Sequence, residues 1–248
     1  NCSDCWPRSW RSLSPPATSP ARPTASNEDR AGHRGSLAWV IDGATDLYDD
    51  AALPAERDVL WLVDFVAEHL TAAGARGYCG PVTALLDDIA ELVCRQQQAY
   101  GFPADRLPPA CSVAVAVDQG DTYEITRIGD ATAVVVTGKR IRILATDFFD
   151  RREGAAVHDQ RNGDTAAQVR TAMIQRRLHT MTAGDIESVF SGHPRRRLRP
   201  HTSSGAWTDV DRILLCTDGF ARLVSDYALY PDWRQVVTDG QTHGLAYL

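Results

Sequence analysis

Helices are predicted in this chain by apolar residues that recur every three or four positions. The first such run, after Pro54, comprises Val59, Leu60, Leu62, Val63, Val66, Ala67 and Leu70, and the second, from about Val82, comprises Leu85, Leu86, Ile89, Leu92 and Val93. Each run gives a helix one apolar face, which is typical of a helix that packs on a protein core. A third helix is predicted at Asp164–Met181 and another near Pro231–Val237.

Strands are predicted where short apolar runs are bounded by glycine and polar turns. The run Leu37–Ile41 is continuous, with β-branched and aromatic residues, and this suits a strand that is buried on both faces. Further strands are predicted at 111–117, 122–128, 131–136, 140–144 and 212–217, and residues 191–204 are predicted as a loop. Because short loops join the four strands within 111–144, we expect an antiparallel meander there.

The order of these elements predicts an α+β protein. Two helices are followed by the meander and then by a late strand, whereas a parallel sheet would need alternating strands and helices. Residues 1–26 contain five prolines, six serines and no periodic apolar pattern, so we expect an extended or disordered arm. Residues 27–248 are expected to form a single domain.

The composition of the chain limits the kinds of molecule that this protein could bind. The net charge of −6 argues against a nucleic-acid binder or a protein that binds anionic membranes, because both need a large positive field. No apolar run approaches the roughly 20 residues of a membrane span, and we expect a cytoplasmic protein. Cys94, Cys111 and Cys216 fall in apolar segments and are expected as buried thiols. The histidines, His193 among them, show no metal-binding spacing and are expected at the surface.

Two strand ends carry the candidate chemistry. Asp42 follows the Leu37–Ile41 run and precedes Gly43, and Asp218 follows the late strand and precedes Gly219. A carboxylate at a strand end is rigid, and glycine lets its own carbonyl approach a bound hard cation. We therefore expect Asp42 and Asp218 to converge on one shallow acidic pocket, with Glu28 at its rim. The alternative is that each Asp-Gly pair is an ordinary turn.

Four motifs in order resemble a known family. They are Asn27-Glu28-Asp29, Val40-Ile41-Asp42-Gly43, Gly129-Asp130-Ala131 and Leu214-Leu215-Cys216-Thr217-Asp218-Gly219. Together they resemble the metal-dependent serine/threonine protein phosphatases of the type 2C class (PPM family), in their bacterial style. The resemblance implies two stacked antiparallel β-sheets flanked by helices, an α-β-β-α sandwich, here lacking its last strand.

The resemblance also implies a cofactor and a role for each acid. Two Mn²⁺ or Mg²⁺ ions would lie between the sheets, and Asp42 would bridge them. Glu28 and the Gly43 carbonyl would serve one ion and Asp218 the other, so Asp42 and Asp218 are the expected catalytic residues. Asp130 would hold a looser third ion, and Asp29 would lie just outside the ligands. The substrate would be a phosphoprotein carrying phosphoserine or phosphothreonine, attacked by a metal-activated water.

Two departures from the family pattern support an alternative function. The arginine that grips the substrate phosphate normally stands four residues before the glutamate, where this chain has Thr24, so Arg22 becomes the candidate phosphate-binding residue. The acidic pair that normally completes the metal site does not follow Asp226. These departures predict weak metal binding and slow turnover, and they leave open a non-catalytic, phosphatase-like binding or regulatory module.

Overall fold

The computed structural model describes residues 27–149, 165–183 and 186–244. The strands are β1 Arg30–Arg34, β2 Leu37–Gly43, β3 Ala110–Asp118, β4 Thr122–Ile128, β5 Thr132–Thr137, β6 Arg140–Leu144, β7 Phe190–Ser191, β8 His201–Ala206 and β9 Arg212–Cys216. The helices are α1 Asp58–Ala75, α2 Val82–Ala99, α4 Ala166–Thr182, α5 Asp218–Ser225 and α6 Trp233–His243, with a 3₁₀ turn, η2, at Trp207–Asp209. The expected arm at 1–26 lies outside the described residues.

The larger sheet, sheet A, is antiparallel and has the strand order β1-β2-β3-β4-β8, with β7 paired to β3. Strand β2 lies between β1 and β3, so the Leu37–Ile41 run is covered on both edges as well as on both faces. The burial expected from its continuous apolar sequence is therefore observed, and Leu37 and Ile41 are completely buried.

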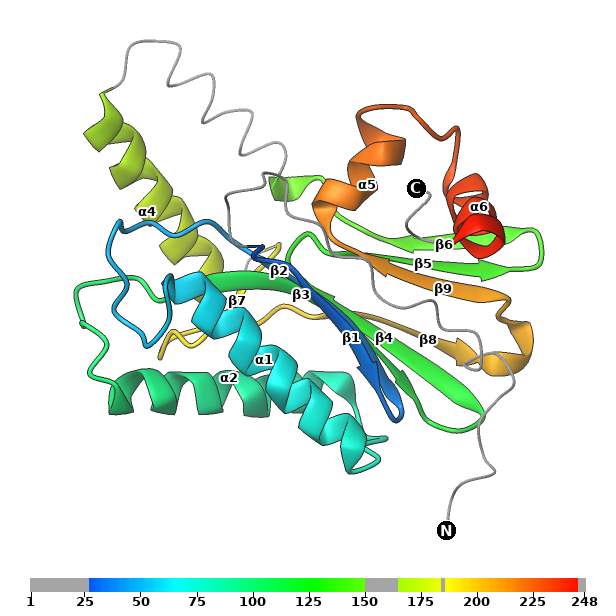
Figure 1. The fold of residues 1–248 in the computed structure, drawn as a ribbon, viewed down its shortest axis with the longest axis horizontal. Coiled ribbons are helices and arrows are strands. Elements are labelled where there is room, and N and C mark those ends of the chain that lie inside the picture. The colour runs from blue at the N-terminus through cyan, green and yellow to red at the C-terminus, as the bar shows by residue number, and fades with distance from the viewer. Residues whose placement is uncertain (1–26, 150–164, 184–185, 245–248) are drawn as a thin grey trace.

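The two faces of sheet A differ in side-chain size, and this difference determines which face packs against the helices and which packs against the second sheet. In β3, Val113, Val115 and Val117 belong to the large core beneath α1 and α2, which cover this face (Figure 1). The alternate residues Ala114 and Ala116 belong to clusters shared with the second sheet. Because side chains along a strand alternate between faces, the Val-Ala pattern gives one face to the helices and one to the other sheet.

The second sheet, sheet B, has the order β6-β5-β9 and stacks on the small-residue face of sheet A. Ala133 and Val135 of β5 pack with Ala116 and Ile125, and Leu215 of β9 packs with Val40 and other residues of sheet A. Helices α5 and α6 lie on the sheet B side of the molecule (Figure 1). The expected α+β fold, with two antiparallel sheets and flanking helices, is confirmed.

Two details of the prediction were wrong. The four strands of 111–144 do not form one meander, because β3 and β4 belong to sheet A and β5 and β6 to sheet B. The chain changes sheet at Gly129, whose φ of +86° is in the region that favours glycine. The predicted loop at 191–204 also contains most of a strand, β8, which pairs with β4 at the edge of sheet A. Its sequence, HTSSGA, lacks an apolar alternation because neither face of this edge strand is deeply buried.

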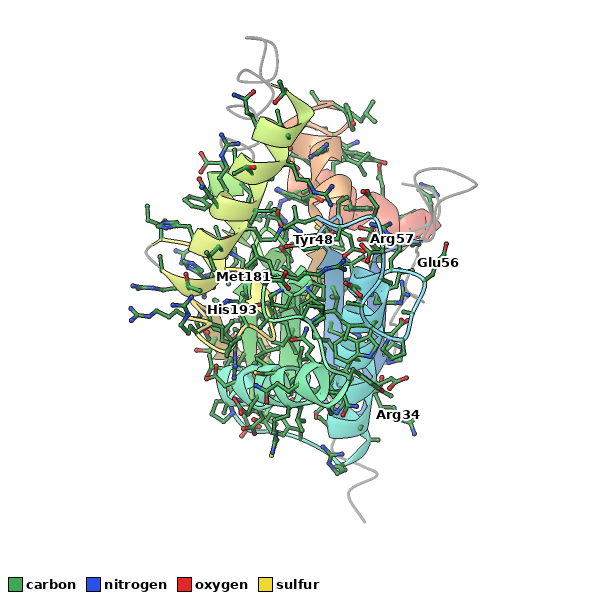
Figure 2. The ribbon with its side chains drawn as sticks, turned by 90° about the vertical axis from the view of Figure 1, so that its left-hand side faces the viewer. Arg34, Tyr48, Glu56, Arg57, Met181 and His193 are labelled. Carbon is green, nitrogen blue, oxygen red and sulfur yellow. The ribbon has the colours of Figure 1, made fainter. Side chains whose placement is uncertain are left out.

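The predicted burial of three cysteine side chains is confirmed, but one histidine that was predicted at the surface is buried. Cys94, Cys111 and Cys216 are buried, as predicted. His193 was expected at the surface, but only 8% of it is exposed. It lies in the segment after β7 (Figure 2). No helix of the described ranges has the length and apolar character that a membrane crossing requires.

Candidate functional site

Asp42 lies at the end of β2 on the face that turns toward sheet B. It is two residues from Val40, which packs with Leu215 of sheet B, and therefore shares its face. Its direct neighbour across the β2–β3 ladder is Ser112. The Asp42 backbone is held by the β2–β3 ladder, and the residue before it, Ile41, is paired with β3 on one edge and with Arg30 of β1 on the other.

Asp218 reaches the same place from sheet B. Strand β9 ends at Cys216, Thr217 is the residue before helix α5, and Asp218 is the first residue of that helix. A carboxylate in the first turn is favoured by the helix dipole. One Asp218 oxygen also accepts a hydrogen bond of 3.2 Å from Arg222, four residues further along the same helix.

Four carboxyl groups gather where these two strand ends meet. The Asp42 carboxyl shares hydrogen bonds with Asp218 and Asp29, and it also feels the charge of Asp130. Burial, the bond to Asp218 and the neighbouring negative charges together raise the pKa of Asp42 to about 10. A carboxyl in this position therefore carries a proton at neutral pH unless a cation takes the proton's place.

Asp29 also belongs to this cluster. It precedes β1, and its side chain interacts with Asp42 and Thr217. Burial is the main cause that raises the pKa of Asp29, and the charge of Asp218 adds to it. The structure thus places Asp29 in direct contact with Asp42, together with Asp218.

The Glu28 side chain has its partner outside the acid cluster. Its carboxylate forms an ion pair with Arg57, the residue before α1, and Arg57 also reaches Asp46 at 3.4 Å. The backbone of Glu28 packs directly on Gly43, where an added Cβ would lie 2.9 Å from the Glu28 Cβ. Gly43 therefore lies between the acid cluster and a second, mixed-charge cluster of Glu28, Asp46 and Arg57.

Helix α4 contributes an arginine to the mixed-charge cluster. Arg177 donates a 2.8 Å hydrogen bond to the Thr45 carbonyl, three residues after Asp42. Burial lowers the pKa of Arg177, while the charges of Asp46 and Glu28 act in the opposite direction. Figure 2 labels Arg57 and Tyr48, which come from the start of α1 and from the loop after β2.

Sequence reasoning missed both arginines near the site. Arg57 precedes a helix and Arg177 lies within one, and neither position carries a local motif that marks proximity to Asp42. The one available signal was the acidic pair at Glu28 and Asp46, which needs a buried or half-buried counter-charge. The expected phosphate-binding residue, Arg22, lies outside the described residues.

The acid cluster suits a hard divalent cation in its chemistry. Its donors are all oxygens and its members all acids, a combination that selects Mg²⁺ or Mn²⁺ over softer metals. Within the described ranges, however, no three Asp, Glu, His or Cys side chains already stand at metal-binding positions. The carboxyls of Asp42 and Asp218 instead lie within hydrogen-bonding reach of each other, and burial raises the pKa of Asp42, so a cation that binds here competes with protons.

Comparison with known protein families gives one result that covers most of the chain. The family described as Protein phosphatase 2C matches residues 21–246. No curated protein sequence gives a significant match.

Several solved protein structures have a fold similar to that of this chain. The serine/threonine phosphatase Stp1 from Staphylococcus aureus is 17% identical, with a TM-score of 0.52, over 84% of this chain and 76% of that one. The PstP/Ppp phosphatase of Mycobacterium tuberculosis is 18% identical, with a TM-score of 0.50, over 82% and 77%. A catalytic domain of PstP solved in complex with two manganese ions is also 18% identical, with a TM-score of 0.50, over 82% and 76%. At these identities the likeness concerns the fold.

Proposed function

The chain belongs to the protein phosphatase 2C family, and from this premise we propose that it hydrolyses phosphoserine and phosphothreonine in phosphoproteins with the help of Mn²⁺ or Mg²⁺. One observation carries the proposal: Asp29, Asp42, Asp130 and Asp218, which are far apart in the sequence, come together where the two sheets meet. Such a concentration of buried negative charge needs protons or cations to be stable.

Asp42 is the central residue of the proposed metal site. Asp218 would bind from the sheet B side, while Asp29, Asp130 and the Gly43 carbonyl would bind from the sheet A side. Glu28 would have to exchange its partner Arg57 for a cation before it could join. When bound, such cations lower the pKa of a coordinated water and polarise a phosphoryl oxygen.

The residues of this chain have separate tasks in that reaction. Asp42 would be the central anionic ligand, and Arg222 orients Asp218 from one side. The substrate phosphate needs a guanidinium, which can make two parallel hydrogen bonds to phosphate oxygens. Arg22 is the sequence-based candidate for this contact, and Arg177 is a second candidate because it already lies beside Thr45.

The proposal is tested with the full chain and a phosphothreonine peptide, by measuring phosphate release with and without Mn²⁺. We expect turnover, even if slow, that needs Mn²⁺ and falls by at least about a hundredfold in Asp42→Asn, which removes the central anionic ligand. Asp121→Asn is the matched control, because Asp121 is exposed in the loop between β3 and β4.

The outcomes separate the candidate functions. Turnover that survives Asp42→Asn would overturn the proposed site. Binding of Mn²⁺ by calorimetry with no turnover on any phosphopeptide would instead favour the non-catalytic, phosphatase-like binding module.

A further inference from the structure

The turn that carries the chain from sheet A to sheet B is held by a side chain outside the acid cluster. The Asp130 backbone N–H donates a 3.1 Å hydrogen bond to the hydroxyl oxygen of Ser112. Ser112 lies in β3 and only 6% of it is exposed. Eighteen residues separate these two partners in the sequence, so this bond is a tertiary contact rather than part of the turn itself.

Ser112 is also the direct neighbour of Asp42. The two residues are paired across the β2–β3 ladder, and side chains of directly opposed residues lie on the same face of a sheet. One buried hydroxyl group thus stands beside the central acid while it binds the backbone of another member of the acid cluster. This arrangement links the positions of Asp42 and Asp130.

The Ser112 side chain is packed very closely against the turn at Gly129. A Cβ added to Gly129 would lie 2.0 Å from the Ser112 hydroxyl oxygen and 2.6 Å from its Cβ, so only glycine permits this approach. From the other side, Arg127 donates a 2.5 Å hydrogen bond to the Gly129 carbonyl. Arg127 is itself fixed by a buried ion pair with Glu187.

From these contacts we propose that Ser112 is a positioning residue that holds Asp130 beside Asp42. Asp130 is then already in position when the acid cluster binds a cation. The inference rests on the proposed metal-dependent function. Groups that orient metal ligands without touching the metal are known to matter for affinity, because they remove the cost of ordering the ligand. Without the Ser112 hydroxyl, the Asp130 amide loses this acceptor and the turn loses a tertiary contact that fixes it to β3.

The test compares two buried serines in the full chain. Ser112→Ala removes the bond to Asp130, and Ser188→Ala removes a similar bond, in which the Ser188 hydroxyl accepts a 2.7 Å hydrogen bond from the Arg199 amide. Ser188 is completely buried and is not part of the acid cluster. By Mn²⁺ calorimetry we expect Ser112→Ala to weaken affinity about tenfold or more, and Ser188→Ala to leave affinity unchanged.

Two calorimetric results would overturn the positioning role. One is wild-type Mn²⁺ affinity in Ser112→Ala, and the other is an equal loss in Ser188→Ala, which would indicate a general effect of a buried cavity. Metal-free crystal structures of the wild type and Ser112→Ala provide a readout that does not need metal or turnover. Asp130 should move away from Asp42 in the variant, and an unchanged Asp130 would reject the inference. If the wild type binds no Mn²⁺, the proposed function fails, and this structural comparison alone decides the role of Ser112.

Discussion

The helix-covered side of sheet A and the sheet B side of the molecule are packed very differently. Every residue of β3 is buried, and Leu62 of α1 and Leu86 of α2 are completely buried beneath it. On the other side, the middle strand β5 is buried from Thr132 to Val136, but only Cys216 of β9 is buried, and neither β6 nor α5 has a buried residue among those described. The sheet B side is therefore buried along its middle strand and more exposed in β6, β9 and α5.

The acid cluster lies across this boundary. Asp42 comes from β2 and Asp29 from the segment just before β1, whereas Asp218 comes from the start of α5 on the more exposed sheet B side. Regions with few buried apolar contacts open locally at a smaller free energy than a core does. We therefore expect Asp218 to adjust its position more easily than Asp42 when a cation binds.

Ion pairs should show the largest contrast, which here is between a buried pair and a half-exposed pair. Arg127 and Glu187 form an ion pair in which each side chain is 4% exposed, whereas Arg222 and Asp218 are 37% and 35% exposed. Arg127→Met leaves Glu187 buried without its guanidinium and should lower the free energy of unfolding by about 3–5 kcal/mol. Arg222→Gln should cost at most about 1 kcal/mol. Urea unfolding followed by circular dichroism measures both, and equal losses would contradict the contrast.

Leucine truncation should show the next largest contrast. Leu62→Ala empties space in a core from which water is fully excluded and should cost about 2–5 kcal/mol. Leu223 of α5 is partly exposed, so water or local movement can fill the space that Leu223→Ala leaves. We expect this variant to lose less than half as much stability in the same urea experiment. A larger loss in Leu223→Ala would mean that α5 is packed as firmly as α1.

The smallest effect concerns pH. Burial, and to a lesser extent the charges of Arg195 and Arg196, lower the pKa of His193 below its usual 6.5. Below about pH 6.5, His193 therefore binds a proton in the unfolded chain but not in the folded chain, where its pKa is lower. The free energy of unfolding is fully retained above about pH 6.5 and falls as the pH drops toward the lower pKa of the folded chain. His193→Gln should remove part of this slope in unfolding measured from pH 7.5 to 5.

The comparison that tests this assignment is between the wild type and His193→Gln. A similar slope for the wild type and His193→Gln would show that other groups cause the pH dependence.

Local patterns in the sequence predicted the elements and the strand-end acids. The three-and-four spacing of Val59 to Leu70 predicted α1, and the apolar run before Asp42 predicted β2, because burial of one face or of a whole strand leaves a direct mark on residue order. Polar strand β8 left no such mark, since an edge strand with partly exposed faces needs no apolar alternation.

Only the tertiary structure decided which acids meet. Glu28 and Asp29 are adjacent in the sequence, yet successive side chains of an extended chain point to opposite sides. Asp29 therefore reaches Asp42, while Glu28 reaches Arg57. The sequence by itself determined the fold class and the acids at the strand ends. The stacking of two sheets determined that Asp29, Asp42, Asp130 and Asp218 share one place, with Ser112 between two of them, because such contacts depend on packing between distant strands.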